Sequence, residues 1–207
     1  MKPPEQEPFE LPQSPQAHRE AEAFIAGEAQ AKRKKFFREY FEWLESLTAA
    51  VVITVLIFTF VGRVATVSGS SMFPTLQDGN MLLLSDLFYQ PAYGDIVIIT
   101  QPHSPQEPLI KRIIATEGQQ VYIDFALGEV YVDGELLDEP YICEPTYQDF
   151  DVTFPQVVPA GHVFVMGDNR NNSLDSRVSR IGMIDERNIL GKVYCRISPM
   201  DEFGRVE

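Results

Sequence analysis

The sequence predicts a mainly β domain preceded by one apolar helix near the N-terminus. Residues 47–62 carry no charged side chain, whereas the rest of the chain after them is divided into short Val-, Ile-, Leu- and Tyr-rich runs. Turn residues bound most of these runs, as expected of β-strands. No comparable long helical pattern follows Val67. We therefore expect a tail over residues 1–46, a transmembrane helix over 47–67 and a β domain over 68–207.

The tail is polar at its start and basic near its end. Residues 1–31 are rich in Pro, Glu, Gln and Ala, so they have little to bury and are expected to be mobile. Lys32–Lys35 and Arg38 follow, mixed with Phe, Tyr and Trp. This composition is typical of a chain that approaches a membrane surface.

The uncharged run at 47–62 would make about 24 Å of helix, against a hydrocarbon core of roughly 30 Å. Extension to Val67 gives roughly 32 Å and places Arg63 near the far end, where its long stem can reach the headgroups. A cleaved signal peptide would have a much shorter segment before its apolar run. Because the basic residues precede the run, the positive-inside rule puts the N-terminus in the cytoplasm and the β domain outside. The sequence thus predicts a single-pass protein of the inner (plasma) membrane or of a thylakoid membrane.

Strands are predicted in order through the outer region, at 80–85, 95–100, 109–116, 120–124, 162–166 and 192–197. Residues 129–137 alternate in hydrophobicity and contain Asp133-Gly134, which predicts a hairpin with a type I′ turn. We expect these strands to form a β-barrel or a sandwich.

Composition limits what this domain can bind. The formal net charge of −13 and the lack of a basic stripe in the outer region argue against nucleic acid. Cys143 and Cys195 do not have the spacing of a zinc site, and nothing in the sequence predicts a metal or another cofactor. The two cysteines could form a disulfide outside the cytoplasm or remain as two buried thiols.

A candidate nucleophile lies just after the apolar run. Ser71 follows Gly69 and precedes Pro74, so it stands on a constrained turn that can present both its hydroxyl and its own N–H to a carbonyl. The alternative is a plain linker leaving the membrane. Neither the G-x-S-x-G elbow nor an S-x-x-K motif is present.

Lys111 is the candidate base. It lies in an apolar strand, where alternation places Leu109, Lys111 and Ile113 on one face; the alternative is an edge-strand lysine that points at water. A lysine base must be neutral, and burial can lower its pKa to about 8 because desolvation disfavours the charged form. We therefore expect Lys111 to be buried among apolar side chains with no carboxylate in contact. A Ser-His-Asp triad using His103 or His162 is the less supported choice.

Residues 167–177 form a polar loop after the predicted strand at 162–166. Read locally, it is an Asn- and Asp-rich turn whose Asp168, Asp175, Arg170 and Arg177 form exposed ion pairs among themselves or with Arg112. Read functionally, the loop fixes the serine and the lysine, with Ser173 hydrogen-bonded to the lysine amine.

Taken together, the motifs S-M-F-P-T, G-D-I-V, K-R and G-D-N-R-N-N-S-L-D-S-R resemble those of type I signal peptidases, and they occur in that family's order. The resemblance covers roughly residues 41–199. It implies a signal-peptidase-like catalytic β domain with Ser71 as nucleophile, Lys111 as general base and the Ser71 backbone N–H in the oxyanion hole. The implied supporting residues are Ser173, Arg112, Asp168, Asp175 and Arg177.

The same resemblance implies the activity and the partners. The family consists of membrane-bound serine endopeptidases that cleave signal peptides from exported preproteins after small residues, through an acyl-enzyme and without a cofactor. The expected partners are signal-peptide-bearing preproteins and the lipid bilayer. Two alternatives stay open: a self-cleaving Ser-Lys regulator, and an inactive membrane-anchored β domain that binds or scaffolds.

Overall fold

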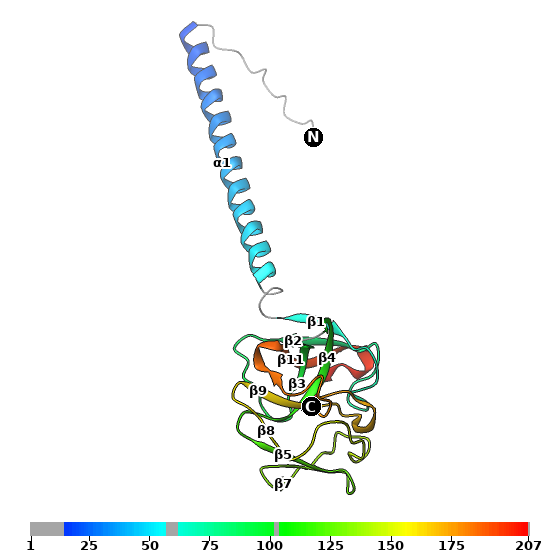
Figure 1. Ribbon diagram of the computed structural model, residues 1–207. Coiled ribbons are helices and arrows are strands. Elements are labelled where there is room, and N and C mark those ends of the chain that lie inside the picture. The colour runs from blue at the N-terminus through cyan, green and yellow to red at the C-terminus, as the bar shows by residue number, and fades with distance from the viewer. Residues whose placement is uncertain (1–14, 57–61, 102–103, 207) are drawn as a thin grey trace, which may run out of the picture. The chain divides into compact units, whose positions relative to one another are not determined.

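The computed structural model describes residues 15–56, 62–101 and 104–206 (Figure 1). The chain divides into two compact units, Met1–Val55 and Leu56–Glu207. The first unit is dominated by one long helix, α1, which spans Pro15–Leu56. The second unit is the β domain.

Helix α1 begins earlier in the chain than composition suggested. Residues 15–31, which we expected to be a mobile tail, are helical. The difference has a physical reason, since Ala, Glu, Gln and Arg are all strong helix formers even where they have nothing to bury. Residues 1–14 of the predicted tail lie outside the described residues.

The predicted transmembrane helix over 47–67 is only partly described. Within the described residues, no helix is both long enough and apolar enough to cross a bilayer. Residues 57–61 of the predicted span lie outside that part of the chain. The extension to Val67 is wrong, because Arg63–Thr66 form strand β1, in which each residue pairs with a residue of Met81–Ser85. β-Branched Val64 and Thr66 suit such a strand.

The β domain contains two antiparallel sheets. Its strands are β1 Arg63–Thr66, β2 Met81–Ser85, β3 Ile96–Gln101, β4 Ser104–Ala115, β5 Gln120–Asp124, β6 Glu129–Val132, β7 Glu135–Leu136, β8 Gln156–Val157, β9 His162–Met166, β10 Ile184–Asp185, β11 Ile189–Ser198 and β12 Gly204–Arg205. Single 3₁₀ turns, η2 to η4, span Arg170–Asn172, Glu186–Asn188 and Met200–Glu202.

The larger sheet has the order β1-β2-β11-β3-β4-β9-β10, with β12 added to β11, and the smaller has the order β7-β6-β5-β8. Since β1 and β10 stand at opposite ends of this path, the larger sheet of the described strands is open and does not close as a barrel. The mainly β prediction is confirmed. The hairpin prediction is also confirmed, because Asp133 and Gly134 have φ of 53° and 83°, the positive values that a type I′ turn requires.

Two apolar clusters place the site. One cluster draws residues from both sheets and packs them together: Ile114, Ala115, Val121, Ile123, Val130, Val132, Val158, Phe164 and Met166. A second cluster includes Val67, Met72 and Leu76, which flank Ser71 in the sequence, together with Leu82, Leu84, Ile96, Ile98 and Val193. The segment that carries Ser71 is therefore tied to the core of the larger sheet.

Candidate active site

Ser71 lies in a turn that the core holds on one side and the loop after β9 holds on the other. The side chains of Met72 and Leu76 are fully buried, and the Leu76 N–H donates to the Met72 carbonyl at 2.8 Å. The loop after β9 fastens the turn from the other side, because the Asn169 N–H donates to the Ser71 carbonyl at 3.0 Å and the Asn169 amide donates to the Ser70 carbonyl at 3.0 Å. These contacts fix the backbone from which the Ser71 hydroxyl projects.

Strand β4 brings Lys111 to this turn. The Lys111 Nζ donates to Ser71 Oγ across 2.7 Å, and the lysine is 1% exposed. The alternative of an edge-strand lysine in solvent is thus excluded by the burial of the side chain. Strand β9 pairs with β4 only between Arg112 and Ala115, so residues 107–110 are not covered by β9. Among the described residues, the ion pairs of the site do not include Lys111.

Burial lowers the pKa of Lys111 from 10.5 to about 8. Asp175 and Asp168 act in the opposite direction and raise the pKa, while the positive charge of Arg177 lowers it. Desolvation is the largest cause, because a buried ammonium loses its water without gaining a carboxylate. At a pKa near 8, roughly a quarter of the amine is neutral at pH 7.5, against about 0.1% for an ordinary lysine.

The arginines and carboxylates of this region form ion pairs, as the sequence predicted, but the pairs are buried in the domain. Arg112 donates to both oxygens of Asp168 at 2.8 and 2.7 Å, and Arg177 donates to both oxygens of Asp175 at 2.8 and 2.9 Å. All four side chains are buried, so the local alternative of exposed ion pairs is wrong. The larger sheet and the loop 167–177 enclose charges that the local sequence presents as a polar turn.

Ser173 does not take its expected place. Its Oγ is buried and has no hydrogen-bond partner in the described part of the chain, so the predicted hydrogen bond to the lysine amine is not formed. The side chain instead packs against Gly167, where an added Cβ would come within 2.2 Å of Ser173 Oγ and 2.4 Å of the Ser71 carbonyl oxygen. Only glycine lets the loop approach the nucleophile turn so closely.

Three further residues hold the charged groups of the site in place and were not predicted from the sequence: Thr75, Glu139 and Tyr141. The Thr75 hydroxyl donates to Asp168 at 2.5 Å and so links the nucleophile turn to the Arg112 ion pair. Arg170 donates to both oxygens of Glu139, and the Arg112 guanidinium lies 3.9 Å from the centre of the Tyr141 ring. Thr75 stands inside the S-M-F-P-T motif and could have been found there, whereas nothing near Glu139 or Tyr141 signals these contacts.

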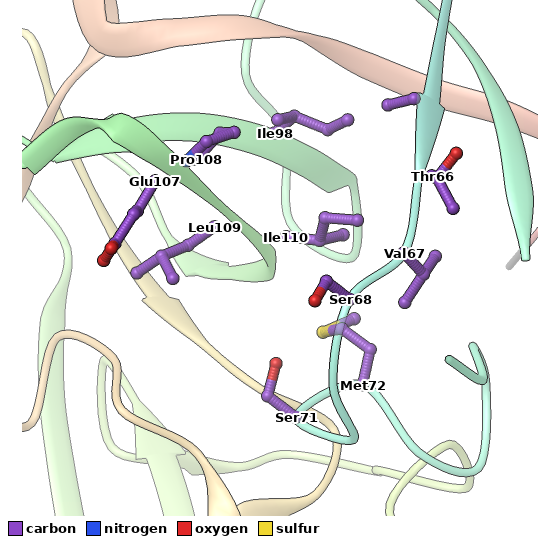
Figure 2. A pocket seen from close by; sticks show the side chains of 11 residues that line it. Thr66, Val67, Ser68, Ser71, Met72, Ile98, Glu107, Pro108, Leu109 and Ile110 are labelled. Carbon is purple, nitrogen blue, oxygen red and sulfur yellow. The ribbon is translucent and has the colours of Figure 1, made fainter. Parts of the chain in front are cut away.

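A cleft of about 480 Å³ opens beside Ser71 (Figure 2). Residues 65–68 form one wall and residues 107–110 of β4 form the other, with Ile98 and Met72 between them. Figure 2 shows the Ser71 side chain directed into the open space between Leu109 and Ser68. The lining is apolar apart from hydroxyl groups and Glu107, so it suits an extended peptide with small or apolar side chains.

Neither His162 nor the two cysteines contact Ser71 or Lys111 in the described part of the chain. His162 contacts the Ala160 carbonyl through Nδ1 at 2.9 Å, and His103 lies outside the described residues. Cys143 and Cys195 are free thiols, so they form no disulfide, and neither is fully buried. The Cys143 thiol donates to the Phe73 carbonyl at 3.3 Å.

Comparison with known proteins supports the resemblance to signal peptidases that the motifs suggested. The sequence model described as "Signal peptidase, peptidase S26" matches residues 40–198. A probable signal peptidase I-1 of Synechocystis sp. is 38% identical over 171 residues, covering 77% of this chain and 83% of the relative. Signal peptidase IB of Staphylococcus aureus is 33% identical over 184 residues, covering 80% of this chain and 93% of the relative.

A solved structure of a signal peptidase I from Enterococcus faecalis V583 is also similar, with 29% identity and a TM-score of 0.43 over 50% of this chain and 97% of that chain. The family model spans most of the β domain, including Ser71, Lys111 and the loop 167–177. The chain therefore belongs to the signal peptidase family, peptidase S26.

Proposed function

We propose that this chain is a membrane-bound signal peptidase that uses Ser71 as nucleophile and Lys111 as general base. The observation that carries the proposal is the 2.7 Å separation of Lys111 Nζ and Ser71 Oγ, with the amine buried and without a carboxylate partner in the described residues. A serine is a weak nucleophile unless a neighbouring base takes its proton, and a lysine acts as that base only when desolvation keeps part of it neutral.

The first step forms an ester. With the amine neutral, the Ser71 hydroxyl donates its hydrogen bond to Lys111 Nζ, and the proton moves to Nζ as Oγ attacks the scissile carbonyl. The negative charge then develops on the carbonyl oxygen, where the Ser71 backbone N–H is our candidate donor. Collapse of this intermediate breaks the peptide bond, and the proton passes from Lys111 to the leaving amine.

The second step returns the enzyme to its starting state. A water takes the place of the leaving amine, gives a proton to Lys111 and attacks the ester carbonyl. The C–O bond to Ser71 breaks, and Oγ recovers the proton from Nζ. Arg112, Asp168, Asp175 and Arg177 support both steps by fixing the loop and the turn, because each carboxylate already has an arginine partner and does not bind the amine.

The cleft beside Ser71 supports the choice of substrate. An extended peptide can lie between residues 65–68 and residues 107–110 as an added strand, with backbone groups recognised along its length. Signal peptides end in small residues of the A-x-A kind immediately before the cleaved bond. Met72, Ile98 and Ile110 in the lining of the cleft offer apolar contacts to such small side chains.

Membrane attachment is part of the proposal. The uncharged residues 47–62 would form the anchor, with the basic residues 32–38 on the cytoplasmic side and the β domain on the outer side. A span of about 24 Å is shorter than the hydrocarbon core, and local thinning of the bilayer would accommodate it. The anchor ends before β1, because Arg63 is already paired in the sheet. Extraction of membranes with alkaline carbonate should leave the chain in the pellet, and its release would contradict the anchor.

The decisive experiment offers a preprotein with an A-x-A signal peptide to the purified chain in detergent. Ser71→Ala and Lys111→Ala should each lower kcat by about 10³-fold or more, and the double variant should lose little beyond either single one, because the two groups act as a unit. Lys192→Ala is the control, since that lysine pairs with Asp95 away from Ser71. Cleavage retained in Lys111→Ala would overturn the assignment of the base.

A further inference from the structure

Glu107 is the charged side chain among the eleven described residues that line the cleft beside Ser71. The others are apolar or carry hydroxyl groups. Glu107 is solvent-exposed and lies on β4 beyond Leu109 as seen from Ser71 (Figure 2). No ion pair of Glu107 is found in the described ranges, so its carboxylate is not committed to a described cation.

The backbone at Glu107 is held in place. β4 pairs regularly with β3 up to Leu109, opposite Ile99, and the pairing then shifts so that Gln101 faces Ser104. Across this irregularity the Gln101 side-chain amide donates to the Glu107 carbonyl at 2.8 Å. The carboxylate therefore projects from a fixed point on the wall of the cleft.

The position of Glu107 along β4 sets which substrate residue it meets. Lys111 stands at the scissile bond, and Glu107 is four residues before it, which is about 13 Å at roughly 3.3 Å per residue. A peptide added as a strand beside β4 has nearly the same rise, so it spans this distance in about four residues. The cleft beside Ser71 would hold the A-x-A residues, which occupy the three positions before the cleaved bond. The substrate residue near Glu107 is therefore the fourth or fifth before that bond.

We propose that Glu107 is a specificity-determining residue that favours a basic over an acidic side chain at the fourth or fifth position before the cleaved bond. This inference rests on the proposed function. A carboxylate beside a bound strand attracts a lysine and repels a glutamate, and like charges placed together discriminate against the wrong substrate. Because the site is open to solvent, the preference should be modest and should weaken in salt.

The test uses the full chain in detergent and peptides that share an A-x-A cleavage site and carry Lys, Gln or Glu at the fourth or the fifth position before the bond. For the wild-type chain at low salt, kcat/KM with Lys should exceed kcat/KM with Glu by roughly two- to five-fold at one of these positions. Glu107→Gln should reduce this ratio towards one, and Glu107→Lys should invert it. Glu135→Gln, an exposed glutamate on β7 of the other sheet, removes the same charge and should leave the ratio unchanged.

The two proposals fail differently. Equal cleavage of the Lys and Glu peptides, or a preference that Glu107→Gln and Glu135→Gln reduce alike, would overturn the role of Glu107 while leaving the peptidase activity established. Failure of the wild-type chain to cleave any of the peptides, or the preprotein, would overturn the proposed function and the inference with it.

Discussion

Lys111 and Arg112 are consecutive residues of β4 with contrasting surroundings. Both side chains are buried, at 1% and 2% exposure. The Lys111 amine contacts the Ser71 hydroxyl, whereas the Arg112 guanidinium binds both oxygens of Asp168 and the Gly94 carbonyl. Strand β4 thus carries, on one face, a lysine with no carboxylate partner among the described residues and, on the other face, an arginine paired with Asp168.

The contrast explains how an ion-pair network can support a neutral amine. Asp168 and Asp175 would each raise the pKa of Lys111 if they acted alone. Each is bound by an arginine through two hydrogen bonds, which fixes the loop and offsets its negative charge. The two buried ion pairs, Arg112–Asp168 and Arg177–Asp175, therefore fix the positions of the loop and the nucleophile turn. The burial of the Lys111 amine lowers its pKa.

The ion pairs can be tested by removing the Arg177 side chain. Arg177→Ala leaves the Asp175 carboxylate buried without its partner and also removes the donor to the Arg170 carbonyl at 2.6 Å. We expect the free energy of unfolding to fall by about 3–5 kcal/mol, measured by urea denaturation. The matched control is Arg187→Ala, which removes an exposed partner of Asp185 and should change stability little. Equal effects of the two variants would contradict the contrast.

The effect of burying the Lys111 amine can be tested with Lys111→Met, which replaces the amine by an apolar chain of similar length. Because the pKa of Lys111 is about 8 in the folded chain and 10.5 when unperturbed, the unfolded chain binds more protons between these values and wild-type stability rises with pH across that window. Below pH 8 the variant should be more stable than wild type by up to about 3 kcal/mol. This advantage should disappear towards pH 10.5.

The measurement is urea denaturation of both proteins at pH 7 and pH 10. Lys192→Met provides the comparison, because it breaks the 2.5 Å ion pair with Asp95 and should lower stability at both pH values. A stability gain of Lys111→Met that is the same at both pH values would show that the buried amine is not the cause.

The contact between the loop 167–177 and the turn that carries Ser71 can be disturbed at Gly167. Gly167→Ala places a Cβ 2.4 Å from the Ser71 carbonyl oxygen, so the loop or the nucleophile turn must move. A displacement of this size at a catalytic group lowers the rate by about 10²-fold, and we expect such a fall in kcat. Gly204→Ala, where an added Cβ meets no atom within 4 Å, should retain full activity. Full activity of Gly167→Ala would show that the approach is not needed.

The sequence predicted those parts of the fold that depend on local pattern. The strand at Gln120–Asp124 and the turn at Asp133-Gly134 follow from alternation and from positive φ, which neighbouring residues determine. The C-terminal part of the predicted span was misassigned because Arg63–Thr66 is apolar enough for either structure, and only its pairing with β2 decides for a strand.

The site shows the same division. Ser71 and Lys111 could be named from their motifs, and the structure places their side chains together. The burial of Asp168 and Asp175 could not, because it depends on the strands and loops that pack over them. Glu139 was missed for a related reason, since its partner Arg170 is distant in sequence and the pair forms only in the folded domain. Ser173 has the right position in the motif, yet its hydroxyl packs on Gly167 instead of reaching the amine.

The pH dependence of kcat/KM for an A-x-A peptide tests the neutral lysine most directly, because it reports the ionisation of the free enzyme. We predict that kcat/KM rises with pH and levels off above an apparent pKa of about 8, the value of the buried Lys111 amine. A rise centred near 6.5, the range of histidine, or one that continues to the range of an ordinary lysine near 10.4 would contradict a Lys111 base made neutral by burial.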